Sequence, residues 1–306
     1  MTQVNTRAAH AAATARMGDI SRQLESVQGQ ISRGRRITDP ADDPVAFARA
    51  AVLRRAQSAD AATQRGIDAA NRRLTATDTA LESSGHLVQR ARELALQAAN
   101  ATQSPADRAT IASELHELEA TLRTLAESHD SDGQRLFAGA AGNGPAYATD
   151  QTGVTAWQGS GGAPAVTIGT SKVAGGSEGP QVFGVTDPVT GTRDAFAAFT
   201  ALRAALVEPD PALRAAGIDR GIGDFDGQVD RIAAARGSLG ARLARLETED
   251  DRIAKGRLAA DGDLSKLEDL DMAAAIARLQ RLVTVMQAAQ ASFSRVTSLS
   301  LWDQLR

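Results

Sequence analysis

The sequence contains no cysteine and very few aromatic residues. Without cysteine among its 306 residues, the chain can form no disulfide, thiolate metal site or cysteine nucleophile. Aromatic residues make up 3% of the chain, with Tyr147 as the single tyrosine. Alanine is abundant instead, and small helix-forming side chains favour long, closely packed helices over a thick globular core. The composition therefore predicts a mainly helical protein.

Long apolar runs and a strong net charge are also lacking. No apolar stretch approaches the roughly 20 residues that span a bilayer, so we expect no membrane insertion. The first 25 residues hold no apolar segment typical of a secretory signal. The net charge of −3 gives no overall attraction to nucleic acid. Six arginines within residues 1–36 could make a helix that binds lipid or nucleic acid. Because no lysine cluster or interleaved aromatic residue accompanies them, we interpret them as a solvated face and predict no nucleic-acid partner.

The sequence also lacks recognisable groups of catalytic residues or metal ligands. The four histidines are scattered and lack the spacing of metal ligands. The stretch DSDG (130–133) has half of a calcium loop but no distal glutamate, and is better explained as a turn. We therefore expect no enzyme activity, catalytic residue, cofactor or metal.

Two helix breaks are visible in the first half of the chain. In the stretch GRRITDPADDP, Gly34 can end a first helix, and Asp43 can cap a second helix whose first residue is Pro44. That second helix could run to about residue 100 without an internal proline. Ser104, followed by proline and then by the acidic Asp107, is typical of the next helix start.

Apolar residues in these helices recur with the seven-residue period of a coiled coil. Small residues at the alternate positions of the second helix would let neighbouring helices approach closely. A similar pattern returns after residue 220. The residues that we predict to pack this rod are Ile67, Leu74, Leu81, Val88, Ile111, Leu115, Leu118, Leu122, Leu125, Val229, Ile232, Leu239, Leu243, Leu246 and Ile253.

The segment 136–191 differs in character from both flanks. Thirteen of the 27 glycines fall between residues 139 and 191, where only four residues are charged. The short stretches TGVTAW, PAVTIG and PQVFGV are β-like and are bounded by glycine and proline. We predict a small, exposed antiparallel β insert here.

Both chain ends carry narrow apolar stripes. The stretch ADGD (260–263) predicts a hinge, and Ser265 to Glu268 resembles a capping box that would open the last helix. A pair of short helices is marginal alone in water, so we expect neighbouring subunits to cover these stripes and the closing SLSLWDQLR. The predicted assembly residues are Ile20, Leu24, Val27, Ile31, Met272, Ile276, Leu279, Val283, Met286, Phe293, Leu299, Leu301, Trp302 and Leu305.

The predicted fold is therefore a long coiled-coil hairpin or rod built from both chain ends, with a small inserted antiparallel β domain. Residues 1–40 and 262–306 would form a terminal assembly domain. Residues 41–135 and 192–261 would form the rod, and 136–191 the β insert.

Three blocks of this sequence, in the same order, resemble the flagellin family of bacterial axial proteins. They are ISRGRRITDPADDPVAFARA, QRARELALQAAN and LEDLDMAAAIARLQRLVTVMQAAQASFSRV. Within that family, the stretches RLFAGAAGNGPAYATD, TAWQGSGG and the closing SLSLWDQL resemble the branch of hook–filament junction proteins more than the filament subunits.

The resemblance implies a secreted structural subunit of the flagellum, exported through the flagellar type III channel. It would form a ring with copies of itself, between the first hook-associated protein and flagellin. An export chaperone would shield its C-terminal helix beforehand. A filament-forming flagellin is the alternative within the family. An enzyme inserted between flagellin-like ends is the alternative from another class, and the insert of about 60 residues lacks an HExxH motif or a paired acid and histidine for it.

Overall fold

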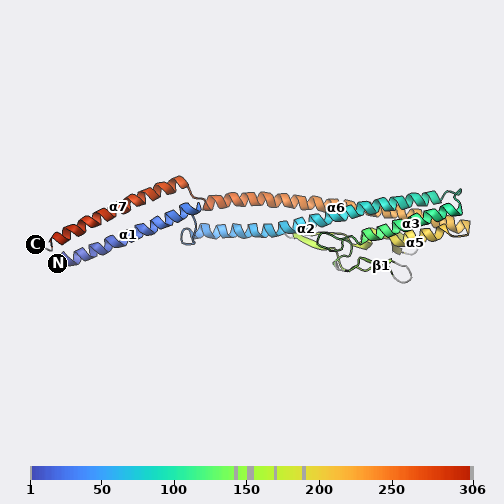
Figure 1. The fold of residues 1–306 in the computed structure, drawn as a ribbon, viewed down its shortest axis with the longest axis horizontal. Coiled ribbons are helices and arrows are strands. Elements are labelled where there is room, and N and C mark those ends of the chain that lie inside the picture. The colour runs from blue at the N-terminus through green and yellow to red at the C-terminus, as the bar shows by residue number, and fades with distance from the viewer. Residues whose placement is uncertain (1, 141–143, 150–154, 169–170, 188–190, 304–306) are drawn as a thin grey trace. The chain divides into compact units, whose positions relative to one another are not determined.

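The computed structural model describes residues 2–140, 144–149, 155–168, 171–187 and 191–303 (Figure 1). Four long helices dominate: α1 (Thr2–Arg33), α2 (Pro44–Ala98), α6 (Pro211–Glu268) and α7 (Met272–Asp303). Shorter helices are α3 (Pro105–Ala126), α4 (Gly179–Phe183) and α5 (Ala195–Leu206). The predicted mainly helical fold, with helices from both chain ends and inserted antiparallel strands, is confirmed. No helix in the described ranges is both long and apolar enough to cross a membrane.

The chain forms two compact units. Unit 1 comprises Met1–Asp60 and Lys255–Arg306, and therefore holds α1, α7, the start of α2 and the end of α6. Unit 2 is Ala61–Ala254, which holds most of α2 and α6 with all the short elements between them.

The turn between α1 and α2 follows the predicted chemistry. Gly34 has a φ of 65°, which only glycine adopts without strain, and it ends α1. Asp43 Oδ1 accepts a hydrogen bond from the Ala46 N–H at 3.0 Å, in the first turn of α2. Asp42 accepts from two backbone N–H groups of the turn, at Thr38 and Asp39, and these bonds lower the pKa of Asp42.

The predicted helix start at Ser104 is confirmed, and it carries a complete capping box. Ser104 accepts from the Asp107 N–H, and the Asp107 carboxylate accepts from the Ser104 N–H at 3.0 Å. Each side chain thereby accepts from a backbone N–H that has no acceptor within the helix.

The predicted hinge at 260–263 is wrong. Helix α6 continues through Gly262 to Glu268, since a single glycine costs only about 1 kcal/mol in a helix and no proline follows it. Ser265 consequently caps nothing, and its hydroxyl instead contacts the Asp269 carboxylate one turn later. The break lies at 269–271, where Asp271 Oδ1 accepts from the Ala274 N–H at 3.0 Å and caps α7.

The strands in the described ranges form three separate antiparallel pairs. They are β1 (Tyr147–Thr149) with β2 (Thr155–Trp157), β3 (Ala165–Ile168) with β4 (Ser171–Ala174), and β5 (Gly184–Asp187) with β6 (Gly191–Asp194). The predicted β character of PQVFGV is wrong for PQVF, which lies in helix α4, and right for Gly184 and Val185, which begin β5. Proline occupies the first turn of α4, and Val182 and Phe183 are buried against the core.

The core of unit 2 lies between α2, α3, α5 and α6. Along α2 the large residues of the predicted rod alternate with buried small ones such as Thr77 and Ser84. On α3, Leu118 and Leu125 are only half-buried, whereas Glu119 and Ala126 are buried. The rod-packing positions that are buried are Ile67, Leu74, Leu81, Val88, Ile111, Leu115, Leu122, Ile232, Leu239, Leu246 and Ile253, and Val229 and Leu243 pack partly buried against them.

Candidate assembly surfaces

Helices α1 and α7 lie side by side in unit 1 (Figure 1). On α1 the buried and half-buried apolar positions are spaced 4-3-4-3-4, and on α7 they follow the same rhythm. The ring of His10, near the start of α1, meets the ring of Phe293 edge-on at 5.2 Å. We call this contact the α1–α7 seam. Its residues are Ala13, Met17, Ile20, Leu24, Val27 and Ile31 on α1, and Ala275, Leu279, Leu282, Met286, Ala289 and Phe293 on α7.

The predicted assembly residues of α7 therefore divide between two faces. Leu279, Met286 and Phe293 belong to the α1–α7 seam. Met272, Ile276 and Val283 point elsewhere and are 43%, 44% and 38% exposed. They form an uncovered apolar edge, which is the surface that a neighbouring molecule can cover.

The predicted assembly residues do not include Ala13, Met17, Ala275, Leu282 or Ala289 of the α1–α7 seam. The signal was present, because Leu279, Leu282, Met286, Ala289 and Phe293 keep strict heptad spacing. The closing residues Leu299, Leu301 and Trp302 continue the α7 backbone. Their side chains, and the whole of Leu305, lie outside the described part of the chain.

The buried carboxylate of Glu268 links the break between α1 and α2 to the break between α6 and α7. Glu268 is 6% exposed, and its Oε2 lies 2.6 Å from Arg54 Nη2 and 3.7 Å from Arg35 Nη1. Arg36 adds two bonds, its N–H to the Glu268 carbonyl at 2.6 Å and its guanidinium to the Leu267 carbonyl at 2.8 Å. These bonds hold the turn after α1 against the end of α6.

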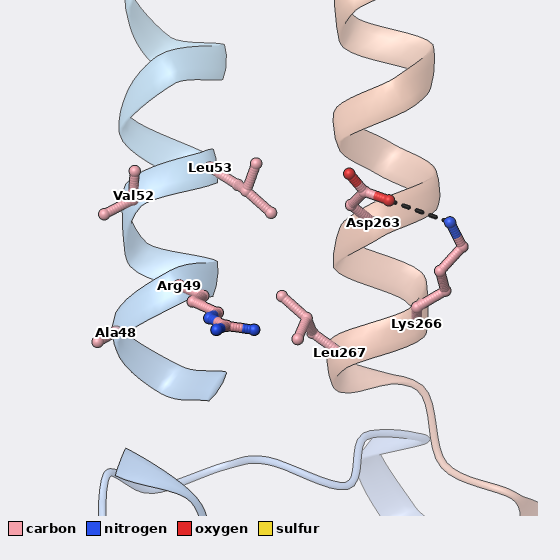
Figure 2. Close-up of a pocket in the computed structure, with 7 residues that line it drawn as sticks. All are labelled: Ala48, Arg49, Val52, Leu53, Asp263, Lys266 and Leu267. Carbon is pink, nitrogen blue, oxygen red and sulfur yellow. Dashed lines mark hydrogen bonds and ion pairs between the residues drawn. The ribbon is translucent and has the colours of Figure 1, made fainter. Parts of the chain in front are cut away.

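An open groove of about 550 Å³ lies beside these contacts, between the start of α2 and the end of α6 (Figure 2). In Figure 2, Leu53 and Leu267 point toward each other across it. Its lining is Ala48, Arg49, Val52, Leu53, Asp263, Lys266 and Leu267.

The two glycine-containing motifs of the insert pack on one another in unit 2. Phe137 is fully buried, and its carbonyl accepts from Trp157 Nε1 at 2.9 Å. Gly139 has a φ of 68°, and a Cβ there would lie 2.6 Å from the Gly161 carbonyl oxygen. The Ala140 N–H donates to the Ser160 carbonyl at 2.8 Å. The stretches RLFAG and TAWQGSGG therefore pack closely against each other.

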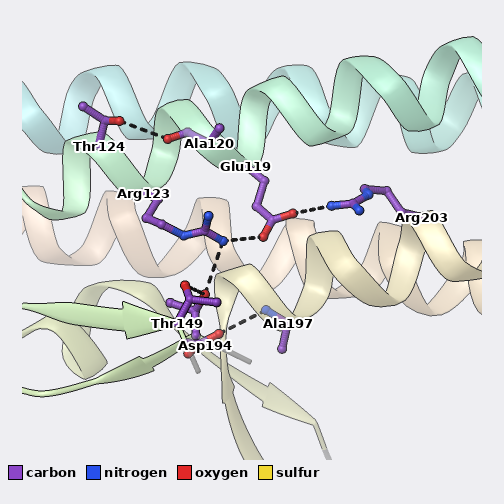
Figure 3. Close-up of polar contacts among 9 residues, drawn as sticks. Glu119, Ala120, Arg123, Thr124, Thr149, Asp194, Ala197 and Arg203 are labelled. Atoms are coloured by element: carbon purple, nitrogen blue, oxygen red, sulfur yellow. Dashed lines mark hydrogen bonds and ion pairs between the residues drawn. The ribbon is translucent and has the colours of Figure 1, made fainter. Parts of the chain in front are cut away.

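A polar network ties α3 to α5 and the first hairpin (Figure 3). Glu119 is 5% exposed and accepts from Arg123 at 2.8 Å and Arg203 at 2.7 Å. Arg123 also donates to the Thr155 hydroxyl at 3.2 Å. Asp194 caps α5 through the Ala197 N–H at 3.0 Å, and its burial raises the pKa of its carboxyl. Glu119 is thus paired with two arginines from two different helices, and these ion pairs position α3 against α5.

The described surfaces do not group the side chains that would ligate a metal. Within the described ranges, no three His, Asp or Glu side chains come together as a metal site would require. Both oxygens of Asp130, from the half calcium loop, already accept hydrogen bonds from Arg73, Asp132 and Gln134. The surfaces suit packing between molecules.

The isolated chain should show a large difference in amide exchange between its two units. We expect fast exchange for residues 1–40 and 262–306, because a two-helix pair with one uncovered edge is marginal in water. The same amides should become protected after assembly, whereas the core amides of unit 2 should be slow in both states. Hydrogen–deuterium exchange read by mass spectrometry measures this, and strong protection of both segments in the monomer would contradict it.

Comparison with known proteins identifies the family. Residues 4–141 match the bacterial flagellin N-terminal helical region, and residues 222–303 match the bacterial flagellin C-terminal helical region. Flagellar hook-associated protein 3 of Escherichia coli (strain K12) is 27% identical over 293 residues, which cover 90% of each chain. A flagellin of Listeria innocua is 24% identical over 276 residues, covering 89% of this chain and 88% of the other.

A solved structure shows the same fold. Flagellar hook-associated protein 3 of Legionella pneumophila aligns with a TM-score of 0.64 at 16% identity, covering 71% of this chain and 98% of the other. Together the two matched helical regions make up more than half of the sequence and contain α1, α2, α3 and α7 almost entirely. The chain belongs to the bacterial flagellin family.

Proposed function

We propose that this chain is a structural subunit of the bacterial flagellum that joins the hook to the flagellin filament. The uncovered edge of α7 is the observation that carries the proposal. A helix pair made from both chain ends leaves Met272, Ile276 and Val283 exposed, and neighbouring molecules would cover them in the assembly. The correspondence with hook-associated protein 3 over 90% of both chains supports the junction role.

The proposed partners follow from that role. Copies of the chain would form a ring, with the first hook-associated protein on one side and flagellin on the other. An export chaperone would cover α7 before secretion, because its apolar edge would otherwise be exposed in the cell. The protein would act outside the cell, at the hook–filament junction, without catalysis. Residues 1–40 and 262–306 would serve assembly, 41–135 and 192–261 would form the rod, and 136–191 the insert.

A filament-forming flagellin is the second candidate, because a flagellin also aligns over most of both chains. Purified filament subunits polymerise into long filaments, whereas a junction subunit should stop at a ring or a short stack. Electron microscopy of the purified protein under polymerising conditions therefore separates the two.

Deleting the gene from the bacterium that carries it should leave bare hooks. Without the junction ring, exported flagellin has no surface on which to polymerise, so it should appear in the culture medium. Electron microscopy of the cells and a blot of the medium for flagellin measure both effects, and the wild-type gene on a plasmid should restore filaments. Cells that keep filaments, fewer or altered in shape, would make this chain a filament subunit instead.

A further inference from the structure

Among the described residues outside α7, the exposed large apolar residues are Val45, Val52, Leu96, Val207, Leu213 and Leu258, and three of them lie at a groove or a turn. Val52, 60% exposed, lines the groove of unit 1. Val207 and Leu213, 69% and 62% exposed, flank the turn between α5 and α6 in unit 2. We call the segment 207–213, VEPDPAL, the α5–α6 turn. Side chains this exposed cost free energy in water and stabilise a complex when another surface covers them.

The groove carries a cation that has no carboxylate partner. Lys266 is neutralised by Asp263, whose Oδ1 lies 3.1 Å from its Nζ. Arg49 is exposed at the rim of the groove, and no ion pair joins it to a carboxylate of the described residues. The groove is therefore apolar along its walls, with one unpaired positive charge at the edge (Figure 2).

The α5–α6 turn has the opposite charge. It carries Glu208 and Asp210 between its two exposed apolar residues. Asp210 Oδ1 accepts from the Ala212 N–H at 2.7 Å, so its carboxylate is fixed at the start of α6. The nearby Arg214 donates to the backbone carbonyls of residues 208 and 209. Within the described residues it forms no ion pair with the carboxylate of Glu208 or Asp210.

The α5–α6 turn is also preorganised before it contacts another molecule. Pro209 and Pro211 fix two of its φ angles, and Glu208 Oε1 accepts from the Asp210 N–H at 3.3 Å. A preformed turn loses little conformational entropy when it binds, so more of the contact energy appears as affinity.

Resting on the proposed function, we infer that the groove of unit 1 binds the α5–α6 turn of a second copy of the chain. Val207 and Leu213 of one copy would cover Val52 and Leu53 of the other, and the carboxylate of Glu208 would pair with Arg49. Such a contact is heterologous, because it joins two different surfaces, and heterologous contacts build rings or stacks. The opposite charges favour this occupant over the α7 edge, because α7 carries no acidic residue before Asp303 that could pair with Arg49.

Cysteine cross-linking tests the contact cleanly because the natural chain has no cysteine. The full-length variant Ala48→Cys/Leu213→Cys is expressed in the deletion strain, and isolated flagella are treated with a short bismaleimide. The two cysteines of each copy should link different neighbours, giving a ladder of dimers, trimers and higher multimers. The control Ala48→Cys/Thr124→Cys places the second cysteine at another exposed helix position, and its multimer yield should be at least about tenfold lower.

Charge reversal supplies the second measurement. In the cross-linking background, Arg49→Glu should lower the multimer yield at least about fivefold, and adding Glu208→Arg should restore it. No ladder above the control in flagella that assemble normally would overturn the inference and leave the proposed function intact. Adducts only with a protein of different mass would overturn the assignment to a second copy. If the wild-type gene fails to restore filaments, the proposed function fails, and the inference fails with it.

Discussion

Replacing Arg73 with alanine should destabilise unit 2 by about 3–5 kcal/mol, the usual cost of leaving one partner of a buried ion pair alone. Arg73 is 8% exposed and pairs with Asp130, whose side chain is also nearly buried. The same guanidinium donates to the Arg135 carbonyl at 2.6 Å. It therefore binds the loop after α3 to the middle of α2.

The surroundings of Asp130 favour the ionised form of its side chain. Burial by itself raises the pKa of Asp130, but hydrogen bonds from the Gln134 N–H, from Arg73 and from the Asp132 N–H lower it overall. Because the folded pKa lies below the unfolded one, the contribution to stability is present above pH 3.8 and is lost as pH falls through the folded value. Removing Arg73 takes away one of those bonds and the opposite charge together.

Urea unfolding followed by the fluorescence of Trp157, which lies in unit 2, measures the loss. The matched control is Arg72→Ala, one residue earlier on the exposed face of α2, where a surface substitution should change stability by less than about 0.5 kcal/mol. Equal midpoints for the two variants would show that the buried pair does not hold the loop.

Removing residues 298–306 should abolish incorporation into the flagellum while leaving unit 2 folded. The segment carries four large apolar residues, Leu299, Leu301, Trp302 and Leu305. Their burial between subunits would be worth roughly 6–12 kcal/mol at about 1.5–3 kcal/mol each. Unit 2 ends at Ala254 and contains none of them, so its unfolding should be unchanged.

Two measurements separate assembly from folding and export. The truncated chain should appear in the medium, which shows export, while electron microscopy of the cells finds hooks without filaments. A full-length control with serine at the four apolar positions keeps the length and should fail in the same way. Filaments restored by the truncated chain would show that this segment is not needed for assembly.

Local signals in the sequence located most of the helix boundaries. Gly34, Asp43 and Ser104 act through bonds within one or two turns, so the residues alone determine what they do. Heptad spacing likewise located the buried face of α2, since that helix has a single buried stripe.

The misplaced features depend on long-range packing. Helix α6 passes Gly262 because a glycine only weakens a helix, and where it ends depends on Glu268 meeting Arg54 from the other half of the chain. Buried Val182 and Phe183 make PQVF helical although its composition is β-like. The two faces of α7 could not be separated from apolar spacing alone, because Leu279 and Val283 are four residues apart and only the position of α1 distinguishes them.

We propose that this chain occupies the boundary between hook and filament. Immunogold electron microscopy of intact flagella, with an antibody raised against the purified chain and flagella of the deletion strain as the control, tests it most directly. We expect one cluster of gold at the end of the hook on each flagellum and none along the filament. Gold distributed over the length of the filament would contradict it and would identify the chain as a filament subunit.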